Sequence, residues 1–565
     1  MKKRYFDLLK NWCDSLLELQ VWDTGQKRLD GGILCPACMN MHGRTSELVY
    51  PLLYLAEETG EEKYLVGAKR LFVWGENLLC DDGSMYNDAQ SSWNGITVFA
   101  AAALCEALGK HGTMLDKDTK ADWEKRLTKM AKWIYKNLTM EFVTNINYHA
   151  ACAGVMALLG KYFAYAPYLQ RAREMAASCL AHVTQEGLLY GEGKPMDKIT
   201  PKGCRPVDIG YNAEESLPLL LLYARTMQDE QALRQIKEML HRQLLFMLPD
   251  GGWDNSFGTR NFKWSYWGSR TSDGCQQAYG IWGNKEPVFA EAALRNLEQY
   301  KACTHNGLLY GGRDYYRHGE AACIHHTFSH AKALATALDA GVTPFKRCQL
   351  PSDNMQPVQY YPTLDTYRIH MGDFIADVTG YDFEYLKGGH TSGGTLSMLW
   401  HKKLGPVIMS SMVDYSLYEA HNMQLSTQTA CCGSLTPRIF TEIEGITYSN
   451  CYDYQAKLNM QQSQACIQVM VDGTLCTVDQ KAAAAPIGYK IVYTFTKQKV
   501  CIEIRLTSAY TKNVFFALPL IGNIKPTASK TQKPVFNLAG GFEAQEHLYE
   551  FNAAGELCVE LATSS

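Results

Sequence analysis

The first two thirds of the chain alternate between two kinds of helical segment, and this repeat constrains the fold more than any other feature. One kind is rich in Lys, Arg and Glu on one face, as is typical of helices that border water. These polar-faced segments lie at about 3–18, 62–78, 119–136, 168–184, 228–245 and 286–302. The other kind is small-residue-rich or apolar nearly all round, which indicates a buried helix. These apolar segments lie at about 44–58, 95–108, 149–162, 213–226, 270–282 and 322–339.

Six alternations with a period of about 50–65 residues predict a closed ring of helical hairpins, an (α/α)6 toroid over residues 1–342. The apolar helices would line the inside of the ring, and the polar-faced helices would surround them. An open solenoid is the structural alternative. Closure is favoured because six hairpins suffice to complete a ring, and because no polar capping repeat is visible.

The pattern changes after residue 342. Residues 343–356 contain proline and have no period, which predicts a linker. Beyond them, period-two runs at 395–403, 405–412 and 489–508 are typical of strands, and the last run predicts a hairpin that turns at Lys497–Gln498. Residues 357–565 are therefore predicted to form an antiparallel β-sandwich of two stacked sheets. The expected fold class is α+β, a toroid followed by a β-sandwich domain.

Composition excludes several classes of partner. The net charge of -3 gives no support for nucleic acid as a partner, and no apolar run reaches the length that a membrane span requires. The first 20 residues resemble an amphipathic helix rather than a signal peptide, and the 19 scattered cysteines are typical of reduced thiols. We therefore expect a cytoplasmic protein with no nucleic-acid or membrane partner. The sequence does not fix the oligomeric state, and a homodimer is left open.

The connections on the two sides of the predicted ring differ. Short turns such as 57–63 and 227–231 follow the apolar helices, whereas long loops of Gly, Trp, His, Arg, Asn and Asp precede them. In a ring, all of these long loops lie on one face. Functional residues are concentrated on such loops when a rigid scaffold carries them. The sequence therefore predicts a site at one mouth of the toroid.

The loop at 251–275 is the richest of these in Trp and Arg, and its five glycines exclude one regular helix or strand. One explanation is that its aromatic side chains fix the loop to the body of the protein. The other is a binding surface, in which indole faces stack on sugars and guanidinium groups pair with carboxylates. The second is favoured because similar loops recur along the chain. We predict that Arg260 and Arg270, which stand among Trp264, Tyr266 and Trp267, hold a substrate carboxylate.

The long loops together supply the candidate site residues. The candidates for catalysis are Tyr211, Glu214, Glu215, Asp254, Asp273, His149 and His326. The candidates for substrate binding are Arg44, Trp93, Asn147, Arg205, Arg260, Trp264, Trp267, Arg270, His325 and His330. Six of these are predicted to line one cavity: Arg44, Trp93, His149, Tyr211, Trp264 and His326. The alternatives are acids at a helix N-terminus for the two glutamates, ion pairs within loops for the arginines, and core hydrogen bonding for the histidines.

Asn147 and His149 open one apolar helix, Tyr211 follows, and His325 or His326 lies about a hundred residues beyond it. In this order and in its architecture the chain resembles the toroid-plus-sandwich enzymes that act on uronic-acid glycans. These are the heparinase II/III-like polysaccharide lyases and the glucuronidases of glycoside hydrolase family 154. The chain departs from the lyase pattern in two ways: Tyr148 separates Asn147 from His149, and Tyr211 lies in a carboxylate-rich segment.

Two chemistries are compatible with these residues. Elimination from a uronide requires a neutraliser for the carboxylate, for which Asn147, His149 and His326 are candidates, and a base, for which Tyr211 is the candidate. Hydrolysis requires two carboxyl groups across the glycosidic bond, and the predicted mouth also supplies carboxyl groups. A cytoplasmic enzyme would meet short imported fragments, which favours hydrolysis.

We therefore predict an exo-acting, β-glucuronidase-like hydrolase of glucuronate-containing oligosaccharides, with an anionic oligosaccharide as its partner and no cofactor. The first alternative is a lyase, and the second is a sugar-binding protein without catalysis. A metal site is the third option, because Cys35 and Cys38 with His42 nearby resemble half of a zinc site. No second C-x-x-C motif follows at zinc-finger spacing, so no metal is predicted.

Overall fold

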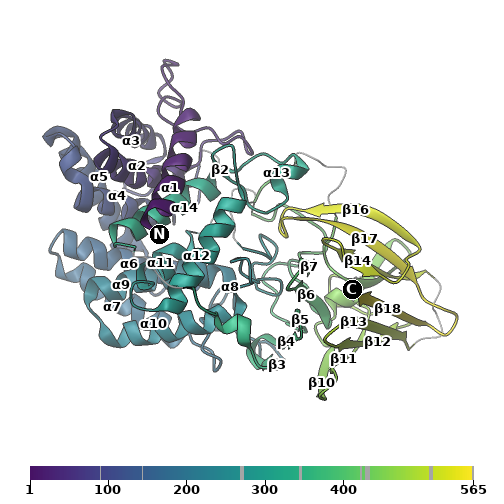
Figure 1. Cartoon of the computed structure of the whole chain (residues 1–565). Coiled ribbons are helices and arrows are strands. Elements are labelled where there is room, and N and C mark those ends of the chain that lie inside the picture. Colours follow the sequence, from purple (N-terminus) through teal and green to yellow (C-terminus); the bar gives the residue numbers. More distant parts are fainter. Residues whose placement is uncertain are drawn as a thin grey trace.

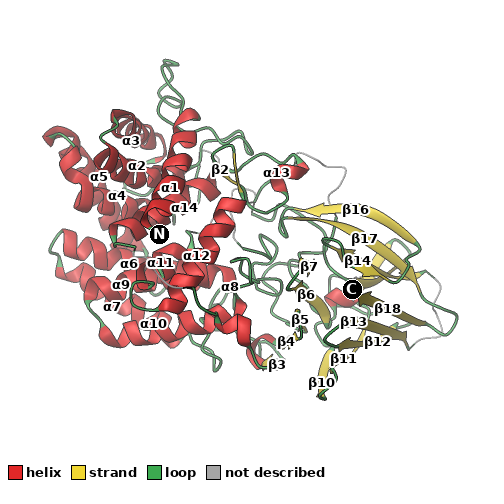
Figure 2. Cartoon of the chain, viewed as in Figure 1, coloured by secondary structure: helices red, strands yellow, loops and turns green. Residues whose placement is uncertain are grey.

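The structure is a computed structural model that describes residues 1–88, 91–142, 144–267, 273–342, 347–419, 423–426, 433–507 and 513–562. Helices make up the N-terminal region and antiparallel sheets make up the C-terminal region (Figures 1 and 2). This agrees with the predicted order of a helical part followed by a β part. Among the described residues, no helix has both the length and the apolar character needed to cross a membrane.

The helical region contains the two alternating kinds of helix that the sequence predicts. The helices with a polar, exposed face are α1 (Lys2–Glu18), α3 (Glu62–Trp74), α5 (Lys117–Asn137), α7 (Ala166–Ala181), α10 (Glu230–Gln243) and α12 (Pro287–Ala302). The mostly buried helices are α2 (Val49–Thr59), α4 (Thr97–His111), α6 (Ile146–Tyr162), α9 (Leu217–Met227), α11 (Tyr279–Trp282) and α14 (Ile324–Asp339). Helix α14 contacts both α1 and α2, so the end of the helical region lies beside its beginning (Figure 1).

Two of the buried helices are interrupted near their starts. The fourth begins with the short α8 (Ile209–Tyr211) and the π-helical turn η4 (Asn212–Ser216) before α9. The fifth, predicted over 270–282, consists of η6 (Cys275–Gln277) and α11, and its first residues lie outside the described part of the chain. Single π turns inside helices often occur at functional sites, because they re-aim the side chains that follow.

Short elements connect these helices: η1 (Gly43–Leu48), η2 (Gly75–Leu78), η3 (Gly112–Met114), η5 (Leu244–Phe246), β1 (Thr304–His305), β2 (Leu308–Leu309) and α13 (Tyr315–His318). Three more short helical turns lie after α14: η7 (Pro351–Asn354), η8 (Pro362–Leu364) and η10 (Asn450–Tyr452).

The described strands beyond residue 357 form three antiparallel sheets rather than the two that were predicted. The first has the order β3 (Val358–Tyr361), β4 (Thr366–Met371), β5 (Phe374–Thr379), β6 (Thr395–His401) and β7 (Gly405–Met409). The second has the order β16 (Thr531–Asn537), β17 (Phe542–Glu550), β14 (Val514–Leu520), β8 (Arg438–Ile443) and β9 (Ile446–Ser449). The third has the order β10 (Lys457–Gln462), β11 (Ile467–Thr474), β12 (Gly488–Phe495), β13 (Lys499–Leu506), β18 (Glu556–Ala562) and β15 (Lys525–Pro526). The predicted hairpin is confirmed as β12 and β13.

The first sheet is a middle layer, which is why a two-sheet sandwich does not describe the region. Strands β5 and β6 are buried along their whole length. On β5, Ile375 belongs to the core of the helical region, whereas its neighbours Phe374 and Ala376 belong to the core of the sheets. Side chains alternate between the two faces of a strand, so this sheet buries one face against helices and the other against strands. It therefore joins the two regions of the molecule.

Candidate active site

A cavity of about 480 Å³ lies where the long loops of the helical region meet loops of the β region. Its lining is rich in charged, amide and aromatic side chains. The polar and aromatic lining residues are Arg44, Asn87, Trp93, Phe99, Thr144, Asn145, Asn147, Tyr148, Lys194, Tyr211, Glu215, Arg260, Lys263, Tyr385, Tyr418 and Glu419. Six of these lining residues are among the predicted site residues: Arg44, Trp93, Asn147, Tyr211, Glu215 and Arg260.

Tyr211 is held by its own short helix. Asp208 caps α8 by accepting a hydrogen bond from the backbone N–H of Tyr211 at 2.9 Å. The ammonium group of Lys263 donates a hydrogen bond to the Tyr211 hydroxyl oxygen at 3.0 Å, and the guanidinium of Arg260 lies 4.6 Å from the centre of the ring. Two cations beside one phenol stabilise negative charge on its oxygen. Tyr211 is therefore well placed to act as a base.

Trp264 supports this tyrosine rather than lining the cavity. A Cβ atom added at Gly210 would lie only 1.5 Å from an atom of the Trp264 ring, so the indole packs directly on the backbone that precedes Tyr211. The side chain is almost completely buried there. The prediction that Trp264 stacks on a sugar is wrong for this conformation, because its faces are covered by protein.

Glu215 and Asn147 form a second group in the cavity. The Asn147 amide donates a hydrogen bond to Glu215 Oε1 at 2.6 Å. Burial raises the pKa of Glu215 to about 8, and repulsion by Asp273 acts in the same direction. The Glu215 carboxyl group is therefore mainly protonated at neutral pH, and it can donate a hydrogen bond to an anionic ligand.

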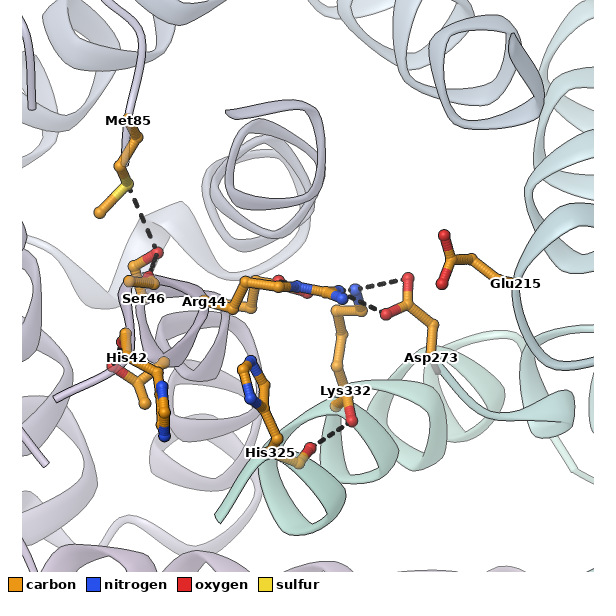
Figure 3. Close-up of polar contacts among 12 residues, drawn as sticks. His42, Arg44, Ser46, Met85, Glu215, Asp273, His325 and Lys332 are labelled. Atoms are coloured by element: carbon orange, nitrogen blue, oxygen red, sulfur yellow. Dashed lines mark hydrogen bonds and ion pairs between the residues drawn. The ribbon is translucent and has the colours of Figure 1, made fainter. Parts of the chain in front are cut away.

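Asp273, another candidate acid, belongs to a buried network of charges instead (Figure 3). It pairs with Arg44 at 2.5 Å and with Lys332 at 3.2 Å, and both cations also pair with Glu47. Burial alone would raise the pKa of Asp273, but Arg44 and Lys332 outweigh it and hold that pKa below its ordinary value. Asp273 is therefore ionised and does not supply a proton, so its predicted role as an acid is wrong.

Arg260 is also paired within the protein. One nitrogen of its guanidinium lies 3.0 Å from Glu419 and another lies 3.4 Å from Glu192. Burial raises the pKa of Glu192 to about 7, although the nearby Arg260 opposes this shift. Lys263 pairs with Glu419 as well, at 2.5 Å. Arg260 still lines the cavity, so its role in holding a substrate carboxylate stays a prediction.

The predicted histidines lie in the protein core. Among the described residues, the cavity lining includes none of His149, His325, His326 and His330. His149 lies 3.3 Å from Ser178 on α7, and burial lowers its pKa to about 4. The other three lie on α14, a helix that is buried on nearly all sides, where His330 donates to the carbonyl oxygen of His326 at 2.6 Å. Their predicted roles are corrected to core packing and hydrogen bonding.

The remaining predicted residues also have other positions. Asp254 forms a buried ion pair with Arg368 of β4 at 2.9 Å, and so joins the two regions. Glu214 lies 3.5 Å from His330, and the Trp267 ring packs 5.8 Å from that of His330. Arg205 donates to the carbonyl oxygen of Asp197 at 2.7 Å, away from the lining set. Arg270 lies outside the described residues.

The predicted site residues leave out several groups at the cavity, among them Lys263, Tyr385 and Glu419, and also Glu192, which pairs with Arg260. Lys263 stands between Arg260 and Trp264 in the loop at 251–275, so its place among predicted site residues was a signal that could have identified it. Glu192 lies between two glycines in a loop after α7, which is a weaker signal. Tyr385 and Glu419 come from the β region. The predicted helical ring does not include that region, so the helical repeat gave no signal for these two residues.

Residues 9–353 match the Ulvan lyase N-terminal domain, and residues 358–537 match the Ulvan lyase C-terminal domain. The chain belongs to the ulvan lyase family. It is 36% identical over 525 residues to a broad-specificity ulvan lyase of Formosa agariphila, a match that covers 91% of this chain and 82% of the relative. The lyase side of the expected resemblance is thus supported, and the glucuronidase side is not.

A solved lyase structure shares the fold at low sequence identity. A chondroitin AC lyase of Streptomyces coelicolor A3 is 11% identical with a TM-score of 0.53, and the match covers 99% of this chain and 79% of that one. A heparan sulfate lyase of Pedobacter heparinus is 8% identical with a TM-score of 0.46, over 90% and 74% of the two chains. The family match overturns the predicted glycoside hydrolase, and it supports the alternative of a polysaccharide lyase.

Proposed function

We propose that this enzyme cleaves ulvan, or a closely related uronic-acid polysaccharide, by β-elimination. The observation that carries this proposal is the Tyr211 hydroxyl at the cavity, with the Lys263 ammonium 3.0 Å away. The name of the relative from Formosa agariphila supports ulvan as the substrate.

The first task of such an enzyme is to neutralise the uronate carboxylate, because a negative charge there opposes removal of the proton at C5. Asn147 and the protonated Glu215 line the same cavity as Tyr211 and can both donate hydrogen bonds to that carboxylate. The Asn147 amide donates to Oε1 of Glu215, which leaves the other carboxyl oxygen to carry the proton. Asn147 thus keeps the role expected from the sequence, and Glu215 takes the place of His149 and His326 in it.

The second task is proton transfer. The ionised oxygen of Tyr211, stabilised by Lys263, takes the proton from C5. The electron pair of the C5–H bond becomes the C4–C5 double bond, and the bond between C4 and the glycosidic oxygen breaks. The departing oxygen then receives the proton from Tyr211, which restores the starting state. The products are a new chain end and an unsaturated uronate.

The test is a reaction of the purified enzyme with ulvan, followed at the ultraviolet absorbance of the C4–C5 double bond. We expect absorbance to rise together with the number of new reducing ends. New reducing ends without absorbance would mean hydrolysis and would overturn the proposal. Binding of ulvan with neither signal would instead support the sugar-binding alternative.

We also propose that the six helix pairs form a complete (α/α)6 toroid. The contacts of α14 with α1 and α2 support this arrangement, because they bring the last buried helix beside the first pair.

A further inference from the structure

Four potential metal ligands from two segments that are distant in the sequence meet outside the lining of the cavity. They are Cys35, Cys38, His42 and Cys323, and one ligand atom from each lies within 4.8 Å of every other. Three of the four are buried, and Cys38 is half-buried. His42 stacks on His325 at 4.7 Å between ring centres, and Figure 3 shows the two rings side by side, below Arg44. The proposed elimination does not use any of these residues.

The spacing of the sulfur atoms suits a shared metal ion. The Sγ atoms of Cys35 and Cys323 are 3.9 Å apart. In a tetrahedral site with Zn–S bonds of about 2.3 Å, two sulfur ligands are separated by about 3.8 Å. A disulfide bond requires a sulfur separation of about 2.05 Å. The observed distance thus corresponds to the edge of a zinc tetrahedron and not to a covalent bond.

The local backbone presents the first three ligands from one tight loop. The backbone N–H of Cys35 donates to the carbonyl oxygen of Asn40, and that of Met39 donates to the carbonyl oxygen of Cys35, both at 2.9 Å. These bonds fold the segment back on itself, so that Cys38 returns towards Cys35. The fourth ligand, Cys323, comes from a separate segment, at the residue that precedes α14.

We propose that Cys35, Cys38, His42 and Cys323 bind one Zn²⁺ ion in a closed, structural site. Three thiolates and one imidazole form one of the ligand sets that hold structural zinc, and soft sulfur ligands in a tetrahedron favour zinc over magnesium or calcium. The sequence pointed to three of these four residues, Cys35, Cys38 and His42, but not to Cys323, which is 288 residues away from Cys35 along the chain.

The position of the site indicates what the ion does. His42 directly precedes η1, which carries Arg44 and Glu47, and Cys323 directly precedes α14, which carries Lys332. These segments meet again in the charge network around Asp273. A metal bound at their starts would fix the two segments relative to each other, and would hold Arg44 at the wall of the cavity.

The first test is metal analysis of the full-length protein, purified under reducing conditions from zinc-supplemented cells. We expect one zinc ion per chain by elemental mass spectrometry. Cys38→Ser and Cys323→Ser should each lower the zinc content by about tenfold or more, because each removes a ligand. Cys303→Ser is the matched control, since Cys303 is a buried cysteine outside the cluster, and it should retain the metal. Equal loss of zinc from this control would overturn the proposal.

The second test avoids substitution, because a variant can lose its fold together with the metal. The parent protein is stripped with a chelator and reloaded with Co²⁺ alone. Intense visible bands of tetrahedral cobalt, with thiolate-to-cobalt charge transfer, are expected. A parent protein that takes up neither zinc nor cobalt would overturn the site, and so would a Cys35–Cys323 disulfide found by mass spectrometry after reducing purification. Neither test depends on lyase activity, so the two proposals stand or fall separately.

Discussion

Glu215 and Asp273 are both buried carboxyl groups on loops or turns that precede inner helices, yet their surroundings give them opposite properties. Glu215 faces the cavity and accepts a hydrogen bond from the neutral Asn147, and burial raises its pKa to about 8. Asp273 lies between two cations that hold its pKa below the ordinary value. A buried carboxyl group with a neutral partner keeps its proton, whereas one with cationic partners loses it.

The comparison separates two regions of the molecule. The cavity wall around Tyr211 and Glu215 holds groups whose protonation can change during a reaction. The charge network reaches this wall through Arg44 and is otherwise outside the lining; it has two cations, Arg44 and Lys332, and two anions, Glu47 and Asp273, and it is electrically balanced. Substitutions in the wall should therefore alter turnover, and substitutions in the network should alter stability.

The largest effect is expected from Tyr211→Phe in the wall. It removes the hydroxyl that transfers the proton, so the turnover number on ulvan should fall by about 10²–10⁴. The initial rate of ultraviolet absorbance measures this effect. Tyr316→Phe, at an exposed tyrosine, is the control and should match the parent. A Tyr211→Phe enzyme within a few-fold of the parent would show that another group is the base.

Asp273→Asn should have the next largest effect, which is a lower free energy of unfolding. The change leaves Arg44 and Lys332 with Glu47 as their remaining anionic partner, and removing one partner of a buried ion pair costs about 3–5 kcal/mol. The free energy of unfolding from urea titration measures the loss. Glu215→Gln is the matched substitution in the wall, and it should leave stability at pH 7 unchanged or higher. Equal losses in the two variants would contradict the distinction between the regions.

Lys263→Met should have an intermediate effect, on turnover. The variant loses the ammonium group that donates to Tyr211, and a hydrogen bond to a charged group contributes about 1.5–3 kcal/mol, which corresponds to roughly a 10- to 150-fold lower rate. Arg260 remains to pair with Glu419. The measurement is the turnover number and KM determined separately. A change confined to KM would mean that Lys263 binds substrate and does not assist Tyr211.

The smallest effect is expected in how the turnover number depends on pH. If the protonated Glu215 binds the substrate carboxylate, activity is present below a pH of about 8 and declines as Glu215 ionises, by about tenfold between pH 7 and 9. Glu215→Gln keeps a hydrogen-bond donor that does not titrate, so its pH profile should lack this decline. The measurement is the turnover number of both enzymes over this range. A decline that persists in the variant would assign it to a different group.

The same two carboxyl groups should affect stability with opposite signs. The folded-state pKa of Glu215 is raised from 4.5 to about 8, so this group lowers stability progressively as pH rises through that range. The folded-state pKa of Asp273 is lowered from 3.8, so its contribution is present above that value and is lost as pH falls. Urea titrations of the two variants across pH check these signs.

Several elements could be predicted from the sequence because their signals are local. The apolar segment at 95–108 corresponds to α4 (Thr97–His111), and the alternating run at 489–508 corresponds to β12 and β13. Periods of 3.6 and 2.0 residues follow from backbone geometry and need no knowledge of distant partners. The same repeat places the long loops on one face of the helical region. Arg44, Asn147 and Tyr211 were therefore predicted to lie together, and they line one cavity.

The periodicity of the sequence does not show which way a side chain points within a helix that is buried on nearly all sides. His325, His326 and His330 stand near the start of α14 and looked available, but the helix is buried on nearly all sides and they point into the core. The prediction of hydrolysis in place of elimination was also wrong. Carboxyl groups at the mouth were counted as acids, although Asp254 and Asp273 are held by Arg368 and by Arg44 with Lys332.

The sequence by itself therefore determined the alternating helices, the strands and the position of the cavity at one mouth of the helical region. Only the tertiary structure decided which carboxyl group is protonated and which cysteines meet. Arg44 and Asp273 are 229 residues apart in the chain, and Cys35 and Cys323 are 288 apart. The pKa of a buried group and the formation of a metal site depend on atoms within a few ångströms. Those neighbours are set by packing between distant segments, which local periodicity does not encode.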